Sequence, residues 1–121
     1  MDTLELLLKT DIPNLPEKEV KLMRLSEICK GDIVFKLRAM SYNRTAEIKK
    51  SAEDDMNVHI ILAGTVEPNL KDADLMAKYK APTPAELVKV LLLPGEIDDI
   101  AREIEVLGGY RNVTVEDIKK K

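Results

Sequence analysis

Aromatic rings, cysteine and histidine are scarce in this chain, and each scarcity excludes a class of protein. The 121 residues include no tryptophan, one phenylalanine, three tyrosines, one cysteine and one histidine. A single cysteine forms no internal disulfide and no cysteine-rich metal site, and a single histidine excludes multi-histidine metal centres. The shortage of rings also argues against a surface on which nucleic-acid bases stack.

An excess of positive charge and long apolar runs are missing too. The formal charge is -3 and the pI is ≈ 5.3, which opposes a surface that follows phosphates, so nucleic acid is not an expected partner. No apolar run approaches the roughly 18 residues of a spanning helix, and "LELLLK" near the start is too short for a signal peptide. We therefore expect a reducing cytoplasmic location and no membrane partner.

Signatures of catalysis and cofactor binding are absent as well. The five glycines are scattered and form no phosphate-binding loop or nucleophile elbow. His59 lies among apolar residues at helical spacing, which favours a structural role, and Cys29 fits a small incidental hydrophobe. Several aspartates invite a cation site, but they lack EF-hand spacing and suit solvated helix faces. They are Asp54, Asp55, Asp72, Asp74, Asp98 and Asp99. We expect a protein that is not an enzyme and that binds no cofactor or metal.

The abundant residues indicate one small helical domain. Hydrophobic residues make up 45% of the chain and charged residues 34%, which is too apolar for a disordered chain. A chain of this length buries roughly two thirds of its unfolded surface, enough for one core. We expect an apolar N-terminal arm with a proline elbow over residues 1–16, and a single domain over residues 17–121.

The arm concentrates apolar side chains that Pro13 and Pro16 separate from the domain. Its members are Leu4, Leu6, Leu7, Leu8 and Ile12. Left in water they would form an unusual exposed patch, because burying one leucine is worth roughly 1.5 to 3 kcal/mol. We expect these five residues to bind a partner. Their own domain, a sister subunit in a homo-oligomer and a client protein all stay open.

The first part of the domain has the pattern of two antiparallel strands. Residues 19–25 alternate imperfectly, whereas "DIVFKLRAM" alternates clearly over residues 32–40, with Phe35 and Leu37 on the apolar face. "SEICKG", residues 26–31, is predicted to connect them. Together with the helical patterns that follow, this predicts an α+β, mainly helical fold, in which a small antiparallel strand pair packs on four or five helices.

The rest of the chain shows helix-starting signals. Ser41 is placed to cap a helix from Tyr42 to Gly64, with a possible break in the charged stretch over residues 49–55. Asp72 is placed to cap a short helix carrying Leu75, Met76 and Tyr79. Thr83 has capping-box spacing to Glu86, with Pro84 at the first helical position.

The stretch "LLLPGEIDDI", residues 91–100, separates the last two long patterns. We interpret Pro94 as the end of one helix and Gly95 as the turn before the next, whose acids fall on its first turn and outer face. The inner stripe of that helix is Ile97, Ile100, Ala101, Ile104 and Leu107. Gly108 and Gly109 close it, and Thr114 with Asp117 predicts a final capped helix ending at Lys121.

Laid in order, several stretches resemble the XkdN-like family of phage tail assembly chaperones. They cover most of the chain after the arm, and the most specific is the capped helix followed by Leu-Leu-Pro-Gly-Glu-Ile. The matching words are "KEVKLMRLSE" (18–27), "FKLRAMS" (35–41), "VEPNLKDADLMAKY" (66–79), "TPAELVKVLLLPGEIDDI" (83–100) and "GGY" (108–110). Lys80, where the family commonly has glycine, and a shorter stretch near "AEDDMN" depart from its pattern.

The resemblance implies a non-catalytic helper of tail assembly in a phage or prophage. It implies binding to the tape-measure protein in the cytoplasm of the bacterial host, and absence from the mature particle. It also raises a frameshifted longer form of the chain as a partner, because consecutive lysine codons at the end can be slippery. A small acidic structural tail subunit and a protein-binding regulator remain the alternatives.

Overall fold

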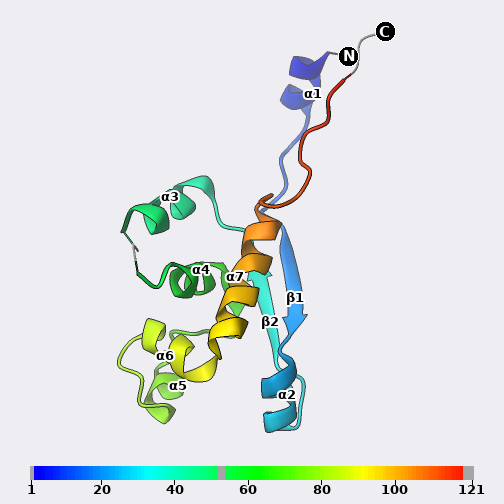
Figure 1. The fold of residues 1–121 in the computed structure, drawn as a ribbon. Helices are drawn as coiled ribbons and strands as arrows, with labels where there is room; N and C mark the ends of the chain where they lie inside the picture. The colour runs from blue at the N-terminus through cyan, green and yellow to red at the C-terminus, as the bar shows by residue number, and fades with distance from the viewer. Residues whose placement is uncertain (1, 52–53, 119–121) are drawn as a thin grey trace.

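A small sheet and a set of helices share one core in this protein (Figure 1). The computed structural model describes residues 2–51 and 54–118. The sheet has the order β1-β2-β3, with β1 at Glu17–Lys21, β2 at Val34–Arg38 and β3 at Thr65–Glu67. All its pairings are antiparallel. The predicted strand pair is confirmed as β1 and β2, whereas β3 lies in a segment for which no strand was predicted.

The alternation in β2 positions the sheet on the core. Phe35 and Leu37 are 2% and 0% exposed, while Val34 and Arg38 face solvent. In the register, Val20 lies opposite Phe35. Because side chains alternate between faces along a strand, this register places the apolar side chains of both strands on the same face.

The sequence prediction between these strands is wrong, because residues Met23–Cys29 form helix α2. The first strand was predicted over residues 19–25, but in the structure it ends at Lys21. Most of the connection predicted over residues 26–31 is helical. Leu22, Leu25 and Ser26 have the i, i+3, i+4 spacing of one helix face, which the apparent alternation of Val20 and Leu22 concealed.

Two local interactions fix α2 against the second strand. Ser26 is only 8% exposed, and its hydroxyl accepts a hydrogen bond from the Ile33 amide at 2.8 Å. Lys30 adopts a left-handed conformation, and the Gly31 amide donates to the Ser26 carbonyl at 3.2 Å. This closing turn redirects the chain into β2.

The predicted helix from Tyr42 to Gly64 is interrupted, as the charged stretch suggested. Its two parts are α3, Tyr42–Ser51, and α4, Met56–Gly64. The cap by Ser41 is confirmed, because its hydroxyl accepts from the Arg44 amide at 3.2 Å. Asp55 precedes α4 in a left-handed conformation, which ends helical continuity there.

Two further capped helices follow as the sequence predicts. Asp72 accepts from the Leu75 amide at 2.9 Å and begins α5, Ala73–Lys78. Thr83 accepts from the Glu86 amide at 3.2 Å and begins α6, Pro84–Leu91. In α6, Leu87 and Val88 are 0% and 1% exposed, so this helix is anchored in the core.

The long helix α7, Pro94–Leu107, corrects the prediction for "LLLPGEIDDI". Pro94 is its first residue and Gly95 its second, so the chain turns at Leu92 and Leu93 instead. A proline suits this position because its missing N–H would have no partner inside the helix. The predicted inner stripe is confirmed at Ile100, Ala101 and Ile104, which are buried.

The predicted final helix is wrong for the described residues after Thr114. Residues 113–118 have no regular structure, and Lys119–Lys121 lie outside the described residues. Val113, Val115 and Ile118 are 95%, 85% and 91% exposed, so the described chain does not cover the apolar side chains of this segment. A short helix without tertiary packing is marginal in water, and β-branched valines weaken it further.

The fold class is confirmed as α+β and mainly helical, with a three-stranded antiparallel sheet in place of the predicted pair. Helix α7 contacts α4, α6 and β2, so it links the sheet to the other helices. The largest fully buried side chains are Leu37, Ile61, Leu87, Val88 and Ile104.

A glycine-to-alanine pair tests the contact between α4 and α7. A Cβ on Gly64 would lie 2.6 to 2.9 Å from side-chain atoms of Ile104, whereas a Cβ on Gly95 meets nothing within 4 Å. We expect Gly64→Ala to lower the free energy of unfolding by about 1 to 3 kcal/mol. Gly95→Ala should leave it unchanged or raise it by up to about 1 kcal/mol. Urea unfolding of both variants measures this, and equal stability would show that Ile104 moves aside freely.

Candidate functional site

The N-terminal arm forms its own short helix, α1, at Thr3–Lys9. Asp2 caps it, since its carboxylate accepts from the Glu5 amide at 2.9 Å. At the other end the Thr10 hydroxyl donates to the Leu6 carbonyl at 2.7 Å. These contacts are local, so the helix is defined by its own residues.

Within the described part of the chain, no residue of α1 is buried. The five predicted partner-binding residues are all largely exposed: Leu4 65%, Leu6 51%, Leu7 61%, Leu8 77% and Ile12 78%. Helical spacing brings Leu4, Leu7 and Leu8 to one face, while Leu6 lies on another and Ile12 follows the helix. Partner binding by these residues stays a prediction, but their own domain does not cover them in this structure.

A second apolar segment, which sequence reasoning missed, projects from the same end of the molecule. Figure 1 shows α1 and the segment after α7 both extending away from the body. That segment carries the exposed Val113, Val115 and Ile118. The alternation of Val113 and Val115 is the signal that would have indicated an extended segment, whereas the prediction rested on the capping-box spacing of Thr114 and Asp117.

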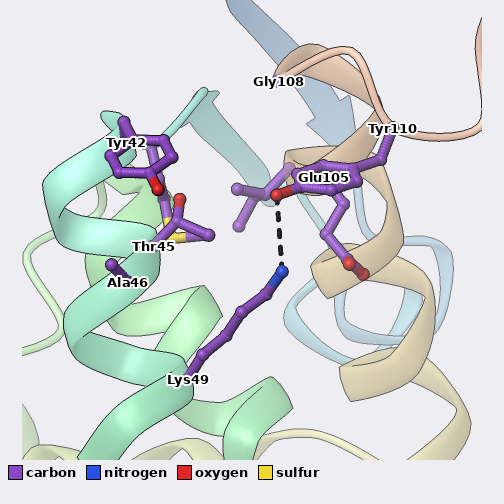
Figure 2. A pocket seen from close by; sticks show the side chains of 9 residues that line it. Tyr42, Thr45, Ala46, Lys49, Glu105, Gly108 and Tyr110 are labelled. Carbon is purple, nitrogen blue, oxygen red and sulfur yellow. Dashed lines mark hydrogen bonds between the residues drawn. The ribbon is translucent and has the colours of Figure 1, made fainter.

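A groove lies between α3 and the carboxyl end of α7, with a volume of ≈ 290 Å³. The side chains that line it are drawn in Figure 2. Its lining residues are Met40, Tyr42, Thr45, Ala46, Lys49, Ile104, Glu105, Gly108 and Tyr110. A smaller hollow of ≈ 30 Å³ shares five lining residues with the groove and adds the apolar side chains of Ile48, Met56 and Ile60. We call this feature the α3–α7 groove.

One polar contact spans the α3–α7 groove. The Lys49 ammonium lies 3.5 Å from the Tyr110 hydroxyl and 5.2 Å from the centre of its ring (Figure 2). Tyr110 is held in place by the turn that ends α7, where its amide donates to the Glu105 carbonyl at 3.2 Å. Gly109 has a φ of 95°, which glycine adopts without strain, so the glycine pair aims Tyr110 at the groove.

Two acids of "LLLPGEIDDI", Glu96 and Asp98, have structural partners. Glu96 forms a two-atom ion pair with Arg24, with its Oε1 2.9 Å from Arg24 Nη2 and 3.2 Å from Nε. The same oxygen accepts from the Leu93 amide at 2.7 Å, which closes the start of α7. Asp98 accepts from the side chain of Asn57 at 2.9 Å. The interpretation of these two acids as structural agrees with this geometry.

Ion pairing accounts for the shifted titratable groups. The hydrogen bond from Arg24 lowers the pKa of Glu96, and the same bond raises the pKa of Arg24. The hydrogen bond from Arg38 lowers the pKa of Glu17, and that between Lys89 and Asp55, at 2.6 Å, raises the pKa of Lys89. Each shift favours the charged form of its group, which is the opposite of a proton donor or acceptor poised near neutral pH.

Two classes of site are missing from residues 2–51 and 54–118. No group of three or more metal-ligating side chains is close enough there to hold an ion. None of the helices in that part is long and apolar enough to cross a membrane. The exposed arm, the exposed C-terminal segment and the α3–α7 groove are candidate surfaces for binding another molecule.

Comparison with known proteins finds a family whose model matches this chain and a solved structure with a similar fold. The model of the family described as "Phage XkdN-like tail assembly chaperone protein, TAC" matches residues 4–120. The crystal structure of the protein yqbn is similar, with a TM-score of 0.69 over 91% of this chain and 98% of that one. At 23% sequence identity this similarity shows the fold alone. No curated protein matches the sequence.

The ion pair at the start of α7 predicts a pH dependence of stability. Because the pKa of Glu96 lies below its ordinary value of 4.5 in the folded protein, the pair stabilises fully above that value and is lost as the pH falls through the folded pKa. We expect Glu96→Gln to lower the free energy of unfolding by about 1 kcal/mol at neutral pH. The difference from the parent protein should shrink below about pH 4.

The matched control is Asp99→Asn, which removes an exposed carboxylate from the same helix. It should change the free energy of unfolding by less than about 0.5 kcal/mol at every pH. Chemical unfolding of the three proteins across the acid range makes the comparison. A Glu96→Gln variant that differs from the parent equally at acid and neutral pH would contradict the assigned ion pair.

Proposed function

Since the chain belongs to the XkdN-like family of phage tail assembly chaperones, we propose that it assists tail assembly by holding the tape-measure protein of its phage. The holding would take place in the cytoplasm of the bacterial host. It would end when the client enters the tail, so that the chain is absent from the mature particle. The proposal includes no catalytic step.

One observation carries the proposal, namely the uncovered leucines of α1. Leu4, Leu7 and Leu8 lie on one face of a capped helix and are each more than half exposed. Burying each of them against a partner would contribute roughly 1.5 to 3 kcal/mol before the entropy cost of association is subtracted. A surface of this kind favours binding to another apolar segment.

The small size of α1 suits a reversible interaction. The helix has seven residues, so it presents far less surface than the roughly 800 Å² per partner of a standard stable interface. An interface of that extent is weak and exchanges readily. A chaperone that must hand its client to the growing tail needs this property.

Leucine has a further advantage over a polar recognition surface. Its contacts are non-directional and need no matched hydrogen-bond partner, so one short helix can dock along different positions of a long amphipathic client. Leu6 is 51% exposed on a second side of α1. The helix therefore presents apolar atoms in more than one direction.

Co-expression with the tape-measure protein tests the function. We expect the affinity-tagged chain to retain that protein on a column and keep it soluble. Leu4→Ser with Leu8→Ser should lower the retained amount at least about tenfold, because two buried leucines would be lost. The matched control is Met23→Ser with Val90→Ser, which removes two exposed apolar side chains elsewhere, 77% and 56% exposed.

Thermal unfolding of the isolated variants separates binding from folding. Because α1 has no buried residue, Leu4→Ser with Leu8→Ser should shift the unfolding midpoint by less than about 2 °C. Equal capture by the arm variant and the control variant would exclude α1 as the client site. Failure of the parent chain to bind a soluble tape-measure protein would overturn the function, and recovery of the chain from purified particles would favour a structural tail subunit.

A further inference from the structure

Among residues 2–51 and 54–118, α1 has no buried residue, and the α3–α7 groove offers partly apolar surface between two helices. We propose that α1 of one copy of this chain binds the α3–α7 groove of a second copy. This inference concerns the isolated protein and does not depend on binding of the tape-measure protein. Apolar packing, charge and the reach of the linker support it.

The apolar surfaces match in kind and in layout. Leu4, Leu7 and Leu8 form a ridge with i, i+3, i+4 spacing, which is how an amphipathic helix occupies a groove between two other helices. On the groove side, Met40 lines the wider part, and the fully buried Ile104 lies beneath its floor. Met56 and the buried Ile60 line the adjoining smaller hollow, and methionine adapts its shape to an incoming side chain.

One pair of charges is complementary as well, because the acidic Glu105 that also lines the groove is already paired with Arg111 at 3.3 Å. Lys49 reaches across the mouth of the groove, where its described contacts are with the neutral phenol of Tyr110 (Figure 2). Glu5 lies in the first turn of α1, directly after Leu4 on the apolar face. With Leu4 and Leu8 in the groove, Glu5 is close to its rim, where a carboxylate would meet the Lys49 ammonium.

The linker between α1 and the sheet favours delivery to a neighbour. Residues 10–16 have no helix or strand, and Pro13 and Pro16 each fix one backbone dihedral. An extended segment of this length spans about 20 Å at about 3.3 Å per residue. Figure 1 shows it carrying α1 away from the body, so the helix is presented outwards.

The exchange would be reciprocal. If the arm of each copy enters the groove of the other, the two contacts are identical and the dimer closes with twofold symmetry. Each contact alone is small, but the second forms within the same complex and gains from a high effective concentration. We therefore expect a dimer that dissociates on dilution.

Light scattering of the purified protein over a wide concentration range is the first test. The mass should rise from monomer to dimer as concentration increases. Leu4→Ser with Leu8→Ser should weaken the dimer at least about tenfold, whereas Met23→Ser with Val90→Ser should leave it unchanged. A parent protein that stays monomeric up to its solubility limit would overturn the proposal, as would equal dimerisation by the arm variant.

Reversing the two charges tests the orientation of α1. Glu5→Lys or Lys49→Glu alone should weaken the dimer several-fold, because each places like charges together, and the doubly reversed protein should recover most of the loss. Both residues are exposed, so neither change should affect folding. Additive losses in the double variant would show that these residues do not meet.

Disulfide trapping identifies which chain supplies the helix. The parent for these variants carries Cys29→Ser, because Cys29 is exposed and would react. After mild oxidation of a mixture of Leu8→Cys and Ala46→Cys proteins, mass spectrometry should find the mixed dimer. Leu8→Cys mixed with Val90→Cys should give far less. Equal trapping at both positions would overturn the groove assignment, and a chain carrying Leu8→Cys with Ala46→Cys that forms only an internal disulfide would show that the arm binds its own groove.

Discussion

The close approach of α4 to α7 is the contact on which the other features of the fold depend. Gly64, the last residue of α4, lies so near Ile104 that a Cβ there would be 2.6 Å from its nearest side-chain atom. Ile104 is 0% exposed, and α7 also contacts α6 and β2. Only a residue without a side chain allows this approach. One missing methyl group therefore sets the position of α7, and α7 in turn sets one wall of the α3–α7 groove.

An ion pair fixes the start of α7 against two other helices, α2 and α6. Arg24 on α2 reaches both the Glu96 carboxylate and, at 2.8 Å, the Leu91 carbonyl at the end of α6. One guanidinium thus connects three helices with donors held in a fixed plane, which a lysine ammonium would not reproduce. The Glu96 side chain is 21% exposed, so the pair is less screened than a fully solvated one. Glu96 and Asp98 of the stretch "LLLPGEIDDI" thus serve the fold.

Local signals in the sequence predicted local structure well. The caps at Ser41, Asp72 and Thr83 were correct because each depends on one side chain and an amide three residues along. The same reasoning failed at Thr114, where the spacing was right but no apolar surface supports the helix. It also failed at α2, because Val20 and Leu22 mimic a strand while Leu22, Leu25 and Ser26 form a helix face. Strand β3 has three residues and depends on its pairing with β2, which no local pattern encodes.

The arm and the α3–α7 groove also differ in how far local sequence signals indicate them. The leucines of the arm stood out in the sequence, because three of the four are consecutive and two prolines separate them from the domain. The α3–α7 groove could not be predicted, because it joins residues 40–49 to residues 104–110, and their meeting depends on the Gly64 contact. The one available signal was the glycine pair before Tyr110, which marks a turn able to redirect a side chain.

On the two proposals together, α1 serves a client and a second copy in turn. A helix that is already bound in a groove is unavailable to the client, so the apparent client affinity falls by the fraction of arms that are occupied. Dimerisation would also reduce aggregation, because exposed leucines promote it. In the dimer the leucines of α1 are removed from water while no client is present. Since a client and a second copy would compete for the same three side chains, client binding should release monomers. The oligomeric state of the chaperone would then report whether its client is present.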